Sequence, residues 1–595
     1  MSIKMEISGQ MDEWMADIGP LELPGSRKVF DRSRELAADT SIGRTRFMDK
    51  AGVSSEAEFK EICIREGRIT FHAHVGLNDW EATAQALDHL DRASADGRFS
   101  LHRAGICLDR RMALPRSYWD RVPAETGPML THDAQWAALG QASAIQPHMG
   151  DFMIGFPASV TNTAAALTAG VTTIGNLSQF FSMEAPLWKD RAATSFETAT
   201  AMALMGCFRG QGALMHSYLE DGFGALFYDC TTMAGWALLE KYIVEELLGA
   251  RISHCIGGLT SDPVKRAGWV FALDEIHDHA CLGSMIYGDT ISFTRDPMVN
   301  AGLVGEYLLW DILAQLECPT GHAVLPLPLT EGIRIPSLEE IQEAQILGAR
   351  TEATARRLHS HVDFSSARSF ARRVVKGGKQ VFSNAVDGLK DMGVDLRDPV
   401  ALLYVLKTMG AARFETWFGA GVPDADAARG RAPVIPTDVF EMSLARLEEH
   451  RPLFLEPEHR ALLEERNLVI ASSDVHEHAV LILERLCREA GARVHYLGVE
   501  KDPDQVARAA MELGADGVFL STHNGMALEY ARKLKQELAV RDGAHLPVVF
   551  GGVLNQKTET SELPVDVSRE ISDLGFIAHG RLKPQLMDHL KAHLT

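Results

Sequence analysis

Residues 467–478 read NLVIASSDVHEH, a short apolar run that ends in polar residues and leads into a helical stretch at 478–490. The same alternation continues to the end of the chain, with further apolar runs at 494–497, 517–520, 547–550 and 575–578. Short strands that alternate with helices predict parallel βαβ units. Five of them within residues 462–595 predict a doubly wound, flavodoxin-like (Rossmann-like) domain, which binds its ligands at the carboxyl ends of the strands.

Polar and glycine residues follow the first, third and fourth of these strands. They are Asp474 and His476, then Ser521, Thr522 and Gly525, and then Gly551 and Gly552. A neutral imidazole is a good ligand for transition metals, and a carboxylate close to it fixes its tautomer and raises its basicity. His478 is a competing ligand candidate, but it lies inside the predicted helix and lacks an aspartate two residues before it.

This pattern resembles the cobalamin-binding domain of B12 enzymes, whose signature is Asp-x-His-x-x-Gly, then Ser-x-Leu, then Gly-Gly. The resemblance implies that His476 is the lower ligand of the cobalamin cobalt and that Asp474 supports it. It also implies that Ser521, with Thr522 and Gly525 beside it, contacts the buried cofactor tail, and that Gly551 and Gly552 leave room for that tail. Two positions depart from the signature, because Ala479 replaces the glycine and His523 replaces the leucine.

Residues 1–455 contain eight more apolar runs that end in polar residues. They are 68–75, 100–108, 143–149, 171–177, 212–218, 225–230, 251–257 and 283–287. Eight strands that alternate with helices predict a (β/α)8, TIM-like barrel, and the stretch 336–449 adds further helices. The overall class is therefore α/β, with a barrel over 1–455 and a cobalamin-binding domain over 462–595.

The polar residues at the ends of the barrel runs are candidates for an active site, since such sites lie at the carboxyl ends of barrel strands. They are His72, His74, Arg103, Asp109, His148, Asn176, Gln179, His216, Asp229 and His254. We take His74, Arg103, His148, His216 and Asp229 as the catalytic candidates. His72 and His74 form an HxH pair whose side chains share one face of a strand, which also fits a metal site completed by His148, His216 or Asp229.

Three stretches of this region resemble the large chain of glutamate mutase (methylaspartate mutase). They are 156–162 with 170–175, then 260–265, and then 413–419. The resemblance implies that Lys265 contacts the adenosyl group of the cofactor. It also shows a departure, because two arginines that bind the substrate carboxylates fall at His74 and near His148, whereas Arg103 keeps the third. Imidazole does not replace a bidentate guanidinium, so glutamate itself is a doubtful substrate.

These resemblances imply a radical carbon-skeleton isomerase (mutase) that uses adenosylcobalamin and acts on a small, carboxylate-bearing substrate. Two alternatives stay open at this point. One is a corrinoid methyltransferase that uses methylcobalamin, with a metal at His72 and His74. The other is a non-catalytic cobalamin sensor or carrier.

The composition limits the partners. The chain has 595 residues, with 59 lysines and arginines against 80 aspartates and glutamates, a formal net charge of −21. This acidic balance argues against nucleic-acid binding, which needs a basic surface. No apolar run is long enough to span a membrane, and the eight cysteines include no CxxC pair. We therefore expect a cytoplasmic protein, a homodimer, with a small-molecule substrate and no nucleic-acid or membrane partner.

Overall fold

The computed structural model describes residues 3–19, 22–124, 127–280, 282–332, 334–424, 427, 429–473, 478–499, 501–523, 525–556, 565–580 and 582–594. The chain forms two compact units, the first from Met1–Gly332 and Pro336–Asp438 and the second from Ile333–Ile335 and Val439–Thr595. The sequence placed the division between 455 and 462, whereas the second unit starts at Val439. Among the described helices, none is long and apolar enough to cross a membrane.

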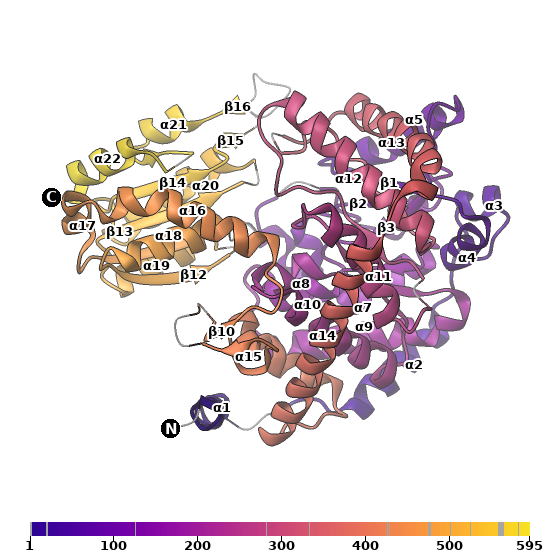
Figure 1. The fold of residues 1–595 in the computed structure, drawn as a ribbon, viewed down its shortest axis with the longest axis horizontal. Helices are drawn as coiled ribbons and strands as arrows, with labels where there is room; N and C mark the ends of the chain where they lie inside the picture. Colours follow the sequence, from indigo (N-terminus) through magenta and orange to yellow (C-terminus); the bar gives the residue numbers. More distant parts are fainter. Residues whose placement is uncertain are drawn as a thin grey trace. The chain divides into compact units, whose positions relative to one another are not determined.

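The first unit is built on eight parallel strands, of which β1, β2 and β3 are labelled among the surrounding helices in Figure 1. They are β1 (Thr70–Val75), β2 (Arg103–Ile106), β3 (Gln146–Met149), β4 (Thr173–Ile174), β5 (Leu214–Tyr218), β6 (Ile252–Ile256), β7 (Met285–Ile286) and β8 (Ala323–Val324). Their order is β7-β6-β5-β4-β3-β2-β1-β8, so nearly every strand pairs with its neighbour in sequence. Just before β7 and β8, the Gly283 amide donates to the Thr320 carbonyl at 2.8 Å and the Thr320 hydroxyl donates to the Ser284 carbonyl at 2.6 Å.

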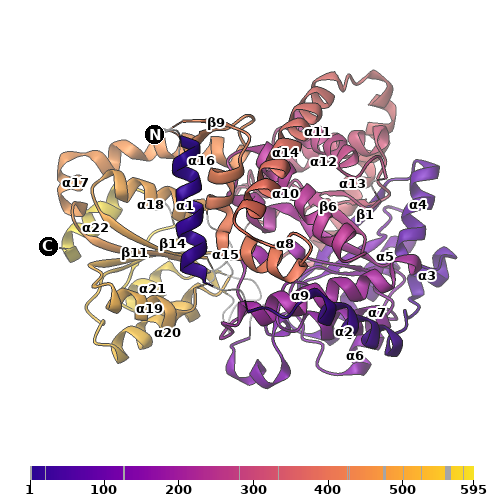
Figure 2. The same ribbon diagram turned by 90° about the horizontal axis from the view of Figure 1, so that it is seen from below.

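Helices surround these strands. They are α1 (Ile3–Ile18), α2 (Ser26–Asp39), α3 (Arg46–Ala51), α4 (Glu56–Glu66), α5 (Trp80–Ala95), α6 (Asp133–Leu139), α7 (Ser159–Thr168), α8 (Leu177–Ser182), α9 (Arg191–Cys207), α10 (Cys230–Lys241), α11 (Pro263–Ile276), α12 (Pro297–Glu317), α13 (Leu338–Leu358), α14 (Ser365–Asp391) and α15 (Pro399–Phe418). The long helix α14 packs along α10 and α11 (Figure 2). A small hairpin, β9 (Val422–Pro423) and β10 (Arg431–Ala432), follows α15. The helical additions predicted over 336–449 are therefore part of this unit as far as Asp438, whereas the helix that begins there belongs to the second unit.

One predicted strand is wrong and one real strand was missed. Residues 225–230 form the end of a 3-10 turn, Phe223–Leu226, and the start of α10. The apolar side chains of this stretch are used in a packed aromatic cluster, in which Phe223 and Phe227 lie 4.9 and 6.1 Å from Trp236 between ring centroids. The eighth strand is instead β8, which pairs with β1 through Thr70 and Phe71.

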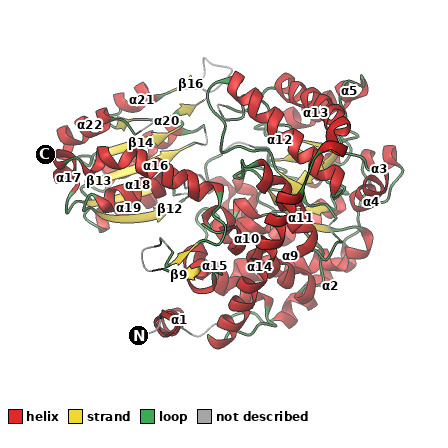
Figure 3. Ribbon diagram, in the orientation of Figure 1, coloured by secondary structure: helices red, strands yellow, loops and turns green. Residues whose placement is uncertain are grey.

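The second unit has a five-stranded parallel sheet in the order β12-β11-β13-β14-β17, and its strands are drawn in yellow between helices in Figure 3. The strands are β11 (Asn467–Ser472), β12 (Arg493–Gly498), β13 (Gly517–Thr522), β14 (Val548–Gly552) and β17 (Ile577–Ala578). The helices are α16 (Asp438–Leu455), α17 (Pro457–Leu463), α18 (His478–Glu489), α19 (Pro503–Glu512), α20 (Ala527–Val540), α21 (Ser568–Asp573) and α22 (Pro584–Leu594), and β15 (Asn555–Gln556) pairs with β16 (Val565–Asp566). The strand order 2-1-3-4-5 is the flavodoxin-like order that the sequence predicts.

Both faces of this sheet are buried, which explains its unbroken apolar strands. On β11, Leu468 and Ile470 belong to one hydrophobic cluster, which includes Leu486 of α18 and Leu586 of α22. The intervening residues Val469 and Ala471 belong to a second cluster with residues of α19 and α20. Helices therefore cover both faces, and the carboxyl ends of the strands are the place where polar groups gather.

Candidate functional site

The register of the second-unit sheet brings the predicted cofactor residues together at one edge. Ser472 on β11 lies opposite Ser521 on β13, and Ser521 lies opposite Gly551 on β14. One residue further along, Thr522 lies opposite Gly552. Three strands thus end side by side in hydroxyl groups and glycines, as the sequence predicts.

Ser521 is the polar group at this edge that most needs a partner. Its side chain is 5% exposed, and in the part of the chain that the structure describes its hydroxyl has no hydrogen-bond partner. A buried hydroxyl left unpaired costs about 1–3 kcal/mol. A ligand that enters between the strand ends would satisfy it, so this observation fits the predicted cofactor tail.

Gly552 must be a glycine. Its φ is +94°, and a Cβ built on it would lie 2.4 Å from the Thr522 carbonyl oxygen. At Gly551, in contrast, the nearest atom to a built Cβ is the His579 carbonyl oxygen at 3.5 Å, so this position has room for an additional atom. Gly525, just before α20, has a φ of +74°, and no atom of the described residues lies within 4 Å of a built Cβ. Among the described residues, the edge is therefore open at Gly551 and Gly525 and tightly packed at Gly552.

Asp474 and His476 lie outside the described residues, together with 475, 477 and 524. They fall between the end of β11 at Ser472 and the start of α18 at His478. Their assignment as the cobalt-ligand pair stays a prediction.

A chain of histidines lines the interior of the first unit. Ring centroids lie 4.8 Å apart for His72 and His74, 6.0 Å for His72 and His148, 5.3 Å for His148 and His216, and 5.1 Å for His216 and His322. Burial lowers the pKa of His74 to about 4 and lowers the pKa values of the other four well below their ordinary value. The predicted HxH pair does share one face, and all five rings are neutral at physiological pH.

His74 is fixed by two residues that the sequence did not indicate. Its Nε2 lies 2.9 Å from the Tyr287 hydroxyl and its Nδ1 lies 3.5 Å from Cys107 Sγ. Tyr287 is in turn stacked on Tyr218, with ring centroids 4.6 Å apart. Tyrosines at strand ends are common core residues, so only the pairing of distant strands identifies them.

Two acids stand near this layer and were also missed. Asp151 Oδ1 accepts from Gln179 at 2.9 Å, and Asp221 Oδ2 accepts from Asn176 at 2.7 Å. Burial raises the pKa of both carboxyls, and the charge of Asp151 adds to the shift of Asp221. Asn176 and Gln179, which the sequence placed at a strand end, therefore donate their side-chain amides to these two acids.

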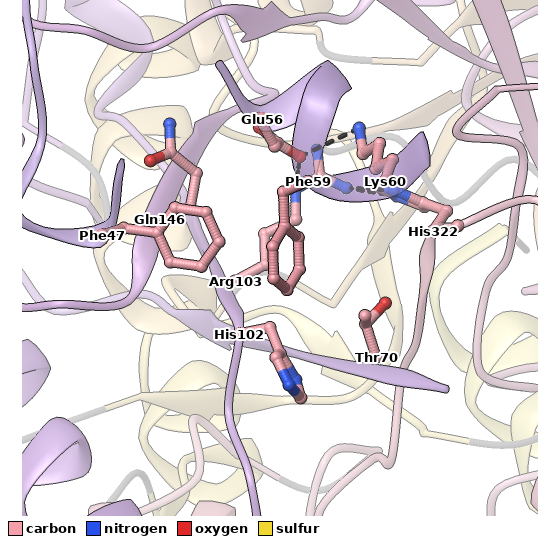
Figure 4. A pocket seen from close by; sticks show the side chains of 10 residues that line it. Phe47, Glu56, Phe59, Lys60, Thr70, His102, Arg103, Gln146 and His322 are labelled. Carbon is pink, nitrogen blue, oxygen red and sulfur yellow. Dashed lines mark hydrogen bonds and ion pairs between the residues drawn. The ribbon is translucent and has the colours of Figure 1, made fainter. Parts of the chain in front are cut away.

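Arg103 was predicted at the carboxyl end of its strand, and that placement is wrong. It is the first residue of β2 and lines a pocket at the amino-terminal ends of β1, β2 and β3, together with Glu56 and Lys60 of α4 (Figure 4). Arg103 Nε lies 3.0 Å and Lys60 Nζ lies 2.9 Å from Glu56 Oε1, and all three side chains are buried. In the sequence, Glu56 and Lys60 look like an ordinary surface pair on a helix, which is why they were missed.

Asp229, Asp109 and His254 each bond to neighbouring groups of the chain. Asp229 caps α10 by accepting from the Thr231 amide at 2.9 Å and also accepts from the Val434 amide at 2.7 Å. Asp109 is bonded to the backbone and side chain of Arg111. His254 points away from the strand interior, because its ring bonds Glu240 of α10 at 3.2 Å and His277 at 2.9 Å. The prediction that His254 lines the interior is therefore wrong.

Lys265 lies in the first turn of α11. Its Nζ is 2.5 Å from Asp438 Oδ1 and donates to the Pro436 carbonyl at 3.0 Å. Its predicted contact with an adenosyl group would require it to exchange this carboxylate partner.

Comparison with known proteins finds similarity in the second unit. Residues 468–569 match the family model of the B12 binding domain. The chain is 35% identical over 104 residues to the glutamate mutase sigma subunit of Halobacterium salinarum, which is 18% of this chain and 67% of that protein. It is 31% identical over 81 residues to the 2-hydroxyisobutanoyl-CoA mutase small subunit of Aquincola tertiaricarbonis (14% and 60%) and 37% identical over 79 residues to the fused isobutyryl-CoA mutase of Paraburkholderia xenovorans (13% and 6%).

The chain thus spans less than a tenth of the length of the fused isobutyryl-CoA mutase that it matches. The second unit carries the shared B12 binding domain, with the strand-end serine and glycines in place. Through this unit, the chain belongs to the family of B12-dependent mutases.

Proposed function

We infer that this protein is an adenosylcobalamin-dependent carbon-skeleton isomerase that acts on a small, carboxylate-bearing substrate. The observation that carries the proposal is the buried Ser521 hydroxyl, which has no hydrogen-bond partner among the described residues and lies between Ser472 and Gly551 inside the matched B12 binding domain. When bound, adenosylcobalamin supplies the hydrogen-abstraction chemistry. The residues of the chain hold the cofactor, bind the substrate and exclude water.

In the second unit, we assign His476 as the ligand of the cobalamin cobalt and Asp474 as the group that fixes its tautomer. Ser521 and Thr522 would bond the cofactor tail, and Gly525, Gly551 and Gly552 would let it approach the backbone. The space at Gly551 supports this assignment, since among the described residues a built Cβ would meet no atom nearer than 3.5 Å. Lys265 is a further proposed cofactor contact.

In the first unit, we propose that the eight strands close as a (β/α)8 barrel. Supporting this, the segments that precede β7 and β8 are joined by the two hydrogen bonds at Thr320, although the described residues include no β7–β8 ladder. A closed barrel would enclose the histidine chain and keep bulk water away from it. Cytoplasmic location and a homodimeric state are also proposals; the lack of disulfides among the described cysteines supports the first, and light scattering would test the second.

The interior chemistry bears on the substrate. His74 and His148 are neutral, so they offer hydrogen bonds and no positive charge. Arg103 is held by Glu56 at the opposite end of the strands. We therefore propose a substrate other than glutamate, with fewer charges to neutralise.

The test is reconstitution of the full chain in the dark with adenosylcobalamin. We expect a base-off, histidine-on spectrum that is lost in His476→Ala and retained in His545→Ala, a control at an exposed histidine of the same unit. An unchanged spectrum in His476→Ala would refute the ligand assignment. Substrate-dependent tritium exchange with the cofactor 5′ position distinguishes an isomerase from a methyltransferase, which would instead transfer a methyl group from methylcobalamin.

A further inference from the structure

Three metal-ligand side chains from different segments converge inside the first unit. They are His216 on β5, Cys255 on β6 and His322, which directly precedes β8. One ligand atom from each lies within 4.8 Å of the other two, and the three residues are 5%, 2% and 3% exposed. Two imidazoles and a thiolate form a donor set that suits zinc or copper(I).

His216 and Cys255 are in direct contact, and the Gly283 carbonyl lies 3.4 Å from His216 Nε2. Cys255 Sγ lies 3.3 Å from His216 Nδ1 and 2.9 Å from Nε2. With metal–nitrogen distances of about 2.0–2.1 Å and metal–sulfur distances of about 2.3 Å, tetrahedral ligands are roughly 3.3–3.6 Å apart.

Surrounding groups orient these ligands, as they do in metal sites. The Gly283 carbonyl lies 3.4 Å from His216 Nε2, and the Met285 backbone hydrogen-bonds to Cys255.

A second observation points to a missing ligand in the same interior. His72 is 1% exposed, and within the described residues neither of its ring nitrogens has a hydrogen-bond partner. His216 is close enough to contribute to the lowered pKa of His72. A buried imidazole with two unsatisfied nitrogens is costly and is available as a further ligand.

Arg103 competes for this site. Its Nη1 contacts His322 and lies 2.9 Å from Nδ1 of that ring. A guanidinium only donates hydrogen bonds, so it occupies a lone pair that an ion would need. Arg103 retains its ion pair with Glu56 if it withdraws, and the thiolate offsets part of the charge that the ion brings.

We propose that His216, Cys255 and His322 bind one thiophilic ion, Zn²⁺ or Cu⁺, inside the first unit. Binding forms one metal–sulfur and two metal–nitrogen bonds and releases the Cys255 thiol proton to solvent, with no change of oxidation state. The site differs from the HxH pair, and it does not depend on the proposed cobalamin chemistry.

The experiment uses the full-length chain purified without cobalamin and treated with a chelator. Zinc sulfate and, under anaerobic conditions, Cu⁺ are titrated separately in competition with a chromophoric chelator, and bound metal is counted by mass spectrometry. We expect one equivalent of one of the two ions, and an affinity that falls about tenfold per pH unit on acidification because one proton is displaced. Zinc or copper K-edge absorption should show one sulfur and two nitrogen neighbours.

Cys255→Ser should weaken metal binding by at least about 100-fold, because losing a direct ligand costs more than losing a residue that only hydrogen-bonds to a ligand. Cys230→Ser is the matched control, since Cys230 is also buried in this unit and lies outside the cluster. Arg103→Leu should strengthen binding because it frees the His322 lone pair. His322→Gln serves as a second ligand variant if circular dichroism shows that Cys255→Ser is misfolded.

Three results would overturn the proposal. They are binding of neither ion by the wild-type chain, equal affinity of Cys255→Ser or His322→Gln and Cys230→Ser, and binding that is lost in His74→Ala but kept in Cys255→Ser. The last result would place the ion at the HxH pair.

Discussion

Lys60 offers a quantitative test of the interior described above. The side chain is 2% exposed, and its ammonium shares Glu56 with the Arg103 guanidinium. Burial, opposed by Glu56 and aided by Arg103, lowers the pKa of Lys60 from 10.5 to about 8. Lys60→Met removes the charge and keeps a long apolar stem, while Glu56 retains Arg103.

The sign and size follow from proton linkage. Between pH 8 and 10.5 the unfolded chain binds a proton at Lys60 that the folded chain has lost, so the free energy of unfolding rises with pH in this window. Below pH 8 both states are protonated, and this lysine contributes no pH dependence. At about 1.4 kcal/mol per pH unit, the wild-type protein should gain about 2 kcal/mol between pH 8 and pH 9.5. Lys60→Met should lack that gain.

Urea denaturation followed by tryptophan fluorescence measures this difference. All nine tryptophans lie between Trp14 and Trp417, so the signal reports the first unit. A chelator is present throughout, which removes any contribution from a bound ion. Lys50→Met, at an exposed lysine, should keep the wild-type pH dependence. If the wild-type and Lys60→Met unfolding free energies run parallel from pH 7 to 9.5, the lowered pKa of Lys60 is refuted.

Three further predictions concern other parts of the chain. Gly552→Ala should destabilise the second unit by more than Gly575→Ala. Both glycines have a φ above +90°, so each substitution costs roughly 1–2 kcal/mol of backbone strain, but only at Gly552 would the new Cβ also clash with a carbonyl oxygen. Thermal unfolding of the two variants measures the difference. Ser521→Ala should weaken cobalamin binding about fivefold to tenfold, the value of one hydrogen bond, and equal titration curves for both proteins would contradict the contact. Arg266→Lys should destabilise the first unit by about 3 kcal/mol in urea, because the buried two-point contact with Asp311 at 2.8 and 2.7 Å is lost, and an unchanged midpoint would contradict this.

The fold of the second unit is predictable from sequence because each central strand is a continuous apolar run. β11 and β13 are buried on both faces, which leaves no polar residue to interrupt them. The first unit is harder, since β4, β7 and β8 have only two residues each. β8 is followed by LPLPL at 325–329, and prolines argue against a strand. Residues 225–230 look like a strand in the sequence but do not form one. Their apolar character serves the packing of Phe227 against Trp236 instead.

The site was predictable where it follows the alternation of one strand. His72 and His74 share a face as expected, and the same rule places His254 outside once Cys255 is recognised as an interior residue. Lys60 and His322 were not predictable in this way. They come from a helix before β1 and a loop before β8, and only the closed packing of distant segments brings them together.

Helix α4 lies before the first strand in the sequence, yet it supplies Glu56 and Lys60 at the amino-terminal ends of β1 to β3 (Figure 4). These residues cover the amino-terminal end of the space between the strands. A shortened protein that begins at Thr70 would lack them, and water would then reach the Arg103 guanidinium. The amino-terminal segment therefore excludes water from that end of the first unit.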